Sequence, residues 1–167
     1  ELYLCRFEAF TTEGKTYLEP GFDAAIDFQP KDIYRRARPN VINLLNTLTN
    51  KLFSKMWLPN YFLYNKYSKF EAERAIVYYK RYPCVTPMWD NAARKRPNFT
   101  VLHGSTPDIY EEWLQSVYDK FEPYSQSENF IFINAWNEWA EGNHLEPDRR
   151  NGRKYLEATK RVLQKNK

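Results

Sequence analysis

Short apolar stretches alternate with helical patterns along the 167 residues of this chain. Strand-like runs are predicted at 2–10, 22–28, 83–88 and 130–135. Helical patterns are predicted at 40–58, 68–79, 106–121 and 150–164. Because such alternation is typical of parallel strands joined by right-handed crossovers, we expect an α/β fold. Four such units make half of an eight-stranded barrel, which usually needs about 250 residues, and an open four-stranded sheet is the alternative.

Capping signals mark the starts of two of the predicted helices. Ser68 and Glu71 have the spacing of a capping box, which predicts that the second helix begins at Ser68. Thr106 followed by Pro107 is typical of an N-cap with proline at the first helical position. We therefore expect a helix that begins directly after Thr106.

Two carboxylates follow the last predicted strand. The run 130–135 is apolar and uncharged, which predicts a strand buried on both faces. Glu138 and Glu141 come next, three residues apart and interleaved with Trp136 and Trp139. If this segment forms one helical turn, the two acids share a face, with Cβ atoms about 5–6 Å apart. That separation suits two groups acting on one bond.

The surroundings of these acids predict a glycan-binding site. Carboxylates among apolar rings lose solvation and repel each other, so at least one should have a raised pKa and serve as a general acid. The indoles offer flat faces for a sugar ring within a ring-lined hollow. Polar groups that could orient hydroxyls are Asn134, Asn137, His144 and Glu146. The alternative is that both acids decorate an exposed turn while the tryptophans belong to the core.

Other polar side chains follow two earlier strands. Asp27 lies at the end of the second strand, and Trp89, Asp90 and Asn91 follow the third. Since α/β folds keep ligand-binding groups at the carboxyl ends of strands, we expect these residues to join the binding site. For Asp27, a loop hydrogen bond is an equally good interpretation. Arg94 and Arg96 come next, and a solvated loop is the alternative interpretation for them.

Composition excludes several classes of function. The net charge is +4 and the basic residues are spread out, which disfavours nucleic-acid binding. No apolar run is long enough to span a bilayer. Cys5 and Cys84 lack metal-ligand spacing and are expected to be buried, reduced thiols, which favours a cytoplasmic location. Thirteen tyrosines, eleven phenylalanines and five tryptophans exceed the needs of a plain core and favour a cleft lined with rings.

Three motifs resemble those of a known family. They are GFDAAIDFQP at 21–30, TPMWDN at 86–91 with a following arginine, and WNEWAEG at 136–142 continuing into HLEPDRR at 144–150. In this order they resemble the WbsX-like proteins of polysaccharide biosynthesis clusters, a family related to the endo-α-mannosidases of glycoside hydrolase family 99. The resemblance covers most of the chain.

This resemblance implies that the chain is the carboxyl-terminal half, strands five to eight, of a (β/α)8 barrel. It also implies roles for the acids. Glu141 would be the general acid/base at the leaving oxygen, and Glu138 would draw a proton from the sugar's own 2-hydroxyl, whose oxygen then attacks the anomeric carbon. That route retains configuration without an enzyme nucleophile and implies no metal or other cofactor.

One position departs from the hydrolases. Ala140 stands where those of family 99 tend to carry a bulkier polar residue, and the alanine form resembles the WbsX branch, whose members are often regarded as glycosyltransferases. The expected function is therefore action on a glycosidic bond of a cell-surface polysaccharide such as O-antigen or capsule. The alternatives are a glycosyltransferase of lipopolysaccharide biosynthesis and a non-catalytic glycan-binding module. Expected partners are a glycan and either the missing amino-terminal half-barrel or a second copy.

Overall fold

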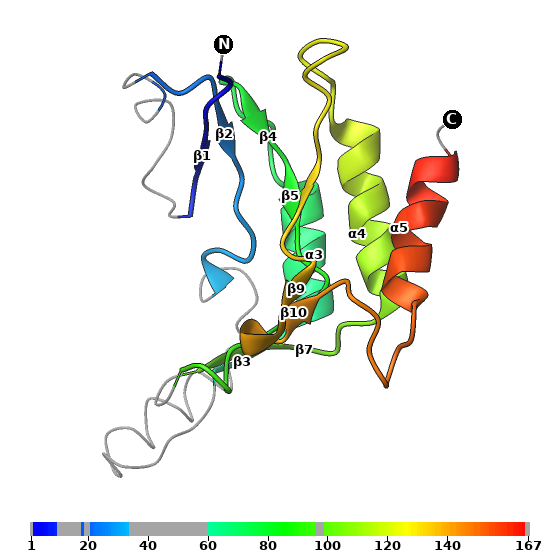
Figure 1. The fold of residues 1–167 in the computed structure, drawn as a ribbon. Helices are drawn as coiled ribbons and strands as arrows, with labels where there is room; N and C mark the ends of the chain where they lie inside the picture. The colour runs from blue at the N-terminus through cyan, green and yellow to red at the C-terminus, as the bar shows by residue number, and fades with distance from the viewer. Residues whose placement is uncertain (1, 10–17, 19–20, 34–59, 96–98, 166–167) are drawn as a thin grey trace.

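Parallel strands form one layer of the computed structural model, which describes residues 2–9, 18, 21–33, 60–95 and 99–165 (Figure 1). The strands β1 (Cys5–Phe7), β2 (Ala24–Ile26) and β4 (Arg81–Tyr82) pair in that order, and β5 (Cys84–Val85) pairs with β8 (Phe132–Ile133). Every one of these pairs is parallel. Only Pro83, which has no N–H to donate, separates β4 from β5. The predicted parallel pairing is thereby confirmed for these strands.

Short strands that the sequence analysis missed lie at the carboxyl end of this layer. The strands β3 (Asn60–Leu63), β7 (Thr100–His103) and β6 (Trp89–Asp90) form a second sheet in the order β3-β7-β6. Here β3 is parallel to β7, whereas β6 is antiparallel to it. A hairpin of β9 (Asn137–Glu138) and β10 (Asn143–His144) encloses the 3-10 turn η2 (Trp139–Glu141). Strands of two to four residues are too short to show a hydrophobic period.

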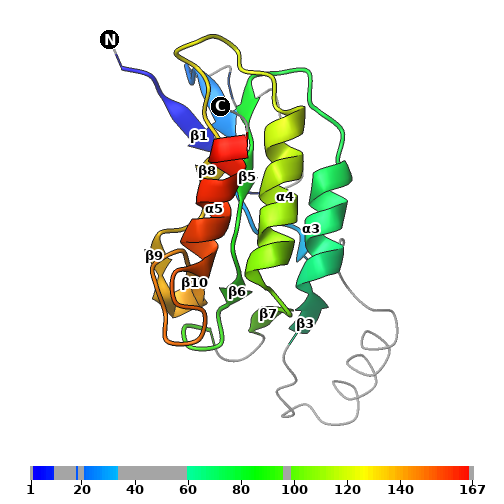
Figure 2. The same cartoon turned by 90° about the vertical axis from the view of Figure 1, so that its right-hand side faces the viewer.

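The described helices α3 (Tyr64–Glu73), α4 (Pro107–Lys120) and α5 (Lys154–Lys165) run side by side along the sheet, with α4 in the middle (Figures 1 and 2). The predicted start of α4 is confirmed, because the Oγ1 of Thr106 accepts a hydrogen bond from the Ile109 N–H at 3.3 Å. The predicted capping box is wrong. α3 already begins at Tyr64, so Ser68 and Glu71 are buried inside it. The predicted helix at 40–58 lies outside the described residues.

Aromatic side chains fill the space between the helices and the sheet. The largest buried rings of this cluster are Tyr64, Tyr67, Tyr110, Trp113 and Tyr155. Their hydroxyls are satisfied: that of Tyr64 donates to the Thr86 carbonyl at 2.6 Å, and that of Tyr155 bonds the Ser105 hydroxyl at 2.8 Å. Much of the aromatic excess therefore belongs to the core, because the tyrosine hydroxyls find polar partners there.

The described strands do not close into a barrel. Within the described residues β1 pairs only with β2, and β8 only with β5, so each lies at an edge. Phe7 of β1 and Phe130 just before β8 are exposed, and Phe132 and Ile133 are half-buried. The expectation that the last strand is buried on both faces is therefore wrong, because nothing described covers this edge.

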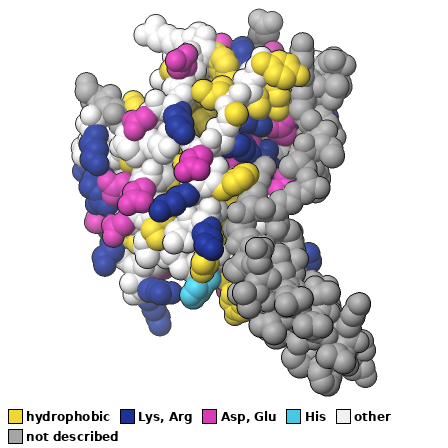
Figure 3. Space-filling model, turned by 180° about the vertical axis from the view of Figure 1, so that it is seen from behind, with side chains coloured by type: hydrophobic (Ala, Val, Ile, Leu, Met, Phe, Trp, Pro, Cys, Tyr) yellow, Lys and Arg dark blue, Asp and Glu magenta, His cyan; other side chains and the backbone are white. Residues whose placement is uncertain are grey.

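Surface and cysteine chemistry partly match the sequence analysis. Acidic and basic side chains are interspersed on the face seen in Figure 3. Both cysteines are free, with Cys84 buried and Cys5 half-buried. Burial raises the pKa of the Cys84 thiol to about 12, which keeps it protonated. None of the described helices has the length and apolar character needed to cross a membrane.

Candidate active site

The β9–β10 hairpin carries both candidate acids and follows β8 directly, at the carboxyl end of the sheet (Figure 1). Glu138 pairs with Asn143 across the hairpin, and Asn137 pairs with His144. The hairpin is also tied to the chain before it, because the Leu145 N–H donates to the Ala135 carbonyl at 3.0 Å. The acids therefore sit at the rim where α/β folds keep functional groups.

Gly142 brings this hairpin against the end of the third predicted strand. Its φ of 52° is left-handed, and a Cβ at this position would lie 3.0 Å from both the Cβ and the carbonyl oxygen of Asp90. Beside it, the hydroxyl of Thr86 donates to Oδ1 of the fully buried Asn143 at 2.9 Å. The structure thus joins the two acid-bearing segments that the sequence analysis assigned to one site.

The Glu141 carboxyl is chemically distinct from an ordinary surface acid. Burial raises its pKa, and the negative charge of Glu138 adds to the rise, whereas Arg94 opposes it. Nη1 of Arg94 lies 2.8 Å from Oε1 of Glu141, and the two side chains are 61% and 18% exposed. The expectation of one raised carboxyl pKa in this pair is confirmed, and such a group suits general acid catalysis.

Two indoles flank the acids on the surface. Trp136 is 52% exposed and Trp139 is 48% exposed. The Trp139 ring stacks on the imidazole of His144, with centroids 3.7 Å apart and planes inclined by 21°. Its Nε1–H donates to Oε2 of Glu146 at 2.7 Å. Neither indole belongs to the core, so the alternative that the tryptophans are core residues is wrong.

The residues after β10 form a tight turn around Asp148. Its Oδ1 accepts hydrogen bonds from the N–H groups of Arg150 and Asn151, at 2.7 and 2.5 Å. Its Oδ2 lies 3.2 Å from Nε2 of His144. Burial alone would raise the pKa of Asp148, but these hydrogen bonds lower it overall. Asp148 is therefore a carboxylate that anchors His144.

The three candidates at β6 contribute unequally. Trp89 is half-buried and packs against the core, and Asp90 is exposed. The Oδ1 of Asp90 accepts from the Ala92 N–H at 2.9 Å, while the Oδ1 of Asn91 accepts from the Thr100 N–H at 2.7 Å. Asn91 therefore helps to hold β6 against β7, and Asp90 is the member of the group that lies next to the hairpin.

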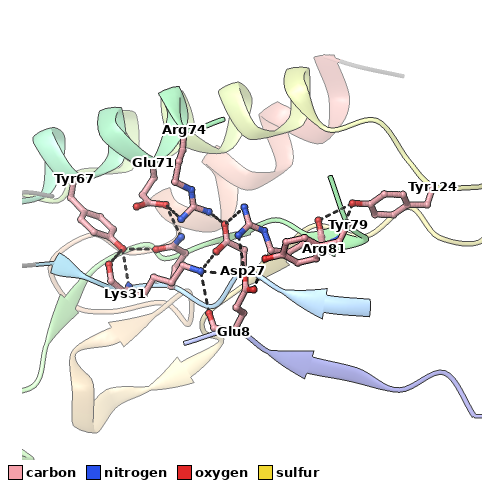
Figure 4. Close-up of polar contacts among 10 residues, drawn as sticks. Glu8, Asp27, Lys31, Tyr67, Glu71, Arg74, Tyr79, Arg81 and Tyr124 are labelled. Atoms are coloured by element: carbon pink, nitrogen blue, oxygen red, sulfur yellow. Dashed lines mark hydrogen bonds and ion pairs between the residues drawn. The ribbon is translucent and has the colours of Figure 1, made fainter. Parts of the chain in front are cut away.

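Asp27 lies in a separate cluster of buried charges, shown in Figure 4. Its carboxylate forms ion pairs with Lys31, Arg74 and Arg81. Glu8 joins through Arg81 at 2.9 Å and Lys31 at 3.6 Å. The acids Glu8, Asp27 and Glu71 oppose the bases Lys31, Arg74 and Arg81, so the charges balance. The structure does not bring Asp27 into contact with the acid pair.

Gln29 connects this cluster to the hairpin. Its side-chain amide accepts from the Tyr67 hydroxyl at 2.5 Å and donates to Oε2 of Glu71 at 2.9 Å. Its backbone carbonyl accepts from Nδ2 of Asn134 at 2.6 Å. Asn134 stands directly before the chain that carries the indoles and acids. Through Gln29, the buried cluster therefore helps to hold Asn134 in position at the start of the candidate site.

A cavity of about 430 Å³ lies near the charge cluster and not at the acid pair. Its lining includes Asp27, Gln29 and Arg74 together with apolar side chains of α4, and neither Glu138 nor Glu141. This cavity is therefore not the expected ring-lined hollow at the acid pair. In that part of the chain, no three His, Cys, Asp or Glu side chains gather in a way that could hold a metal ion.

Sequence reasoning missed several residues that build the site. Arg94, for which a solvated loop was the alternative, is mostly exposed and also pairs with Glu141. Thr86, Asn143 and Asp148 hold the hairpin in place. The three motifs could have indicated Thr86, Asn143 and Asp148, since each lies within or directly beside one of them.

Paired carboxylates beside exposed indoles thus lie at the carboxyl end of parallel strands, where α/β folds keep functional groups. The chain belongs to the WbsX family: the family described as Glycosyltransferase WbsX matches residues 1–159.

Two relatives and one solved structure are similar to this chain. Two proteins bearing the name "Uncharacterized protein WxcX", from Xanthomonas campestris pv. campestris strains B100 and ATCC 33913, are each 34% identical over 144 residues. The match covers 86% of this chain and 20% of each relative, so the chain spans about one fifth of their length. A solved "Glycoside hydrolase-like protein" has a similar fold, with a TM-score of 0.51 and 15% identity, over 97% of this chain and 44% of that one.

Proposed function

We propose that this chain carries the acid/base centre of an enzyme that acts on glycosidic bonds. The observation that carries this proposal is the Glu141 carboxyl, whose pKa is raised by burial and by Glu138. Two half-exposed indoles stand beside it and offer flat surfaces to a sugar. A carboxyl with a raised pKa keeps its proton to a higher pH than an ordinary acid, and in its protonated form it can protonate a leaving oxygen.

In the proposed reaction, Glu141 donates its proton to the glycosidic oxygen as the bond to the anomeric carbon breaks. Glu138 accepts the proton of the sugar's 2-hydroxyl, and that oxygen forms the new bond to the anomeric carbon. Glu141, now a carboxylate, then takes a proton from water, which attacks the anomeric carbon and reopens the ring formed with O2. Glu138 returns its proton to O2, so configuration is retained and both acids are restored.

The substrate we propose is a glycan of a cell-surface polysaccharide such as O-antigen or capsule. Trp136 and Trp139 supply stacking surfaces, while Asn137 and Asp90 are exposed near the acids and suit hydroxyl recognition. Asn91 and Trp89 lie behind them, where they support β6. A hydrogen-bonding rim around apolar rings is the usual composition of a ligand site.

We also propose that the chain is the carboxyl-terminal half of a (β/α)8 barrel. Support comes from the strand order and from the edges β1 and β8, which lack a second partner among the described residues. The solved structure of similar fold extends well beyond the matched region, which is 44% of that chain. The expected partner is then the other half-barrel or a second copy. Sedimentation of the isolated chain tests this, since a stable monomer that resists aggregation would contradict it.

The decisive experiment for the enzyme replaces each acid by its amide. Glu141→Gln and Glu138→Gln should each lower turnover of a cleaved oligosaccharide by about 10²–10⁴-fold while binding persists. Glu112→Gln, an exposed acid on α4, is the matched control and should leave turnover unchanged. Full activity in both site variants would refute the assigned roles.

A glycosyltransferase is the second candidate, favoured by the description of the family. It would require an activated sugar donor, so product formation that depends on an added nucleotide sugar distinguishes it from hydrolysis in water. A third class, a non-catalytic glycan-binding module, would show glycan affinity unaffected by Glu141→Gln and no turnover of any oligosaccharide.

A further inference from the structure

One face of the Trp139 indole is covered from inside the protein. The imidazole of His144 stacks against it at a centroid distance of 3.7 Å. The indole nevertheless remains 48% exposed, so solvent reaches the opposite face. An aromatic ring held on one side and open on the other is suited to bind the flat, apolar face of a sugar ring.

His144 itself is not positioned to meet a ligand. It is only 8% exposed, and its Nδ1 is buried without a hydrogen-bond partner among the described residues. Its Nε2 lies 3.2 Å from Oδ2 of Asp148. Since that carboxylate can only accept, Nε2 carries the hydrogen, and this contact fixes the orientation of the ring.

The edge of the indole is fixed as well. Oε2 of Glu146 accepts the Nε1–H of Trp139 at 2.7 Å, which restrains rotation of the indole about its side-chain bonds. Asp148 in turn is held by the N–H groups of Arg150 and Asn151. The order of support therefore runs from the turn through Asp148 and His144 to Trp139.

We propose that His144, Asp148 and Glu146 are positioning residues that hold Trp139 as a stacking platform for a neutral sugar ring next to Glu141. This inference rests on the proposed function and deepens it, because it assigns the open face of Trp139 as the sugar subsite. His144 acts through Trp139 and does not touch the substrate. A planar apolar ring in its place should therefore retain part of this support, because it can still cover the indole face although it cannot bond to Asp148.

The test compares His144→Ala, His144→Phe and Asp148→Ala with the unmodified protein. Two quantities are measured: the nuclear magnetic resonance position of the Trp139 indole N–H, and the affinity for maltoheptaose, cellohexaose and mannohexaose. His103→Ala, at the chain's other histidine, is the matched control because His103 is exposed on β7.

We expect His144→Ala and Asp148→Ala to shift the Trp139 resonance and to weaken oligosaccharide binding by about tenfold or more, whereas His144→Phe should lose less affinity than His144→Ala and the control should keep both quantities. Equal losses of affinity in His144→Phe and His144→Ala would overturn the proposal, since coverage of the indole by a planar ring would then have no role. An unchanged Trp139 resonance in His144→Ala, or the absence of any response of Trp139 to all three oligosaccharides, would also overturn it.

Failure of the proposed function is a separate result. Sugar binding to the platform does not require Glu141, so Glu141→Gln should still show the Trp139 response. If the Trp139 resonance responds to an oligosaccharide while Glu141→Gln leaves turnover intact, the assignment of Trp139 as a sugar platform is supported and the catalytic role of Glu141 is refuted.

Discussion

Nη1 of Arg94 donates a hydrogen bond to Oε1 of Glu141 at 2.8 Å, so a mostly exposed cation pairs with the carboxyl that we assign as the acid. The pair links the turn after β6 to the hairpin after β8. A guanidinium favours the ionised form of this carboxyl, whereas burial and Glu138 favour the protonated form. Burial and Glu138 prevail, and the pKa is raised.

Removing Arg94 should change the pH dependence of turnover. A general acid works only while protonated, so activity falls as pH rises through the Glu141 pKa. Because Arg94 lowers that pKa, Arg94→Ala should raise it further and move the alkaline limb of the pH–rate profile to higher pH. Lys95→Ala, in the same exposed turn, should leave the limb in place. A limb that moves to lower pH would contradict the assignment of Glu141 as the acid.

Gly142→Ala should displace the hairpin. The left-handed backbone costs about 1–3 kcal/mol for a residue with a side chain, and the new Cβ would press on Asp90 at 3.0 Å. Gly152 has a similar φ of 58° but open space around it, so Gly152→Ala is the control for backbone strain alone. Urea unfolding should show the larger loss for Gly142→Ala, accompanied by lost turnover. Equal losses would show that the contact with Asp90 has no energetic role.

Thr86→Val tests the anchor beneath the hairpin. Valine keeps the shape of threonine but removes the donor to Oδ1 of Asn143, which is fully buried. An unsatisfied buried acceptor costs about 1–3 kcal/mol, so the midpoint of urea unfolding should fall by the equivalent amount. Thr159→Val removes the hydroxyl that bonds to Tyr110, away from the hairpin, and should destabilise the fold without altering turnover by the remaining folded protein. Similar turnover in both variants would contradict a local role for Thr86.

The charge cluster should make stability depend on pH in the acidic range. Burial alone would raise the pKa of Glu8, but hydrogen bonds from Tyr79 and Arg81 lower it overall from the usual 4.5. Glu8 therefore stabilises the fold fully above pH 4.5, and this contribution is lost as pH falls through its lower pKa in the folded state. Urea unfolding on both sides of that pH should show the decline, and Glu8→Gln should make it less steep. An equally steep decline in the variant would assign the effect to other acids.

Local signals predicted the parts of the fold that depend on neighbouring residues. The start of α4 follows from Thr106 and Pro107, and its end at the extended Phe121 matches the predicted boundary. The Ser68–Glu71 spacing gave the wrong start for α3, because both residues are buried there by contacts with distant groups. The Glu71 carboxylate, for example, accepts from Gln29, 42 positions earlier in the chain.

The sequence motifs predicted which residues belong to the candidate site, but they did not predict how those residues are arranged in space. The order of the motifs placed Asp90 and Glu141 at one edge of a sheet, and the close approach of Gly142 to Asp90 shows that their two segments meet there. The turn after β6, which brings Arg94 to Glu141, depends on pairing between β6 and β7, and β7 is too short to reveal itself by periodicity. Asp27 has the sequence position of a ligand-binding residue, but three cations surround it.

The hydrogen bond from Asn134 to the Gln29 carbonyl links the candidate site to buried residues of α3. A substitution at Tyr67 or Glu71 would loosen Gln29 and, through it, the chain leading to the indoles. If the WNEWAEG segment is grafted onto another scaffold, it should consequently lose its conformation unless Gln29 and its partners Tyr67 and Glu71 are transferred as well.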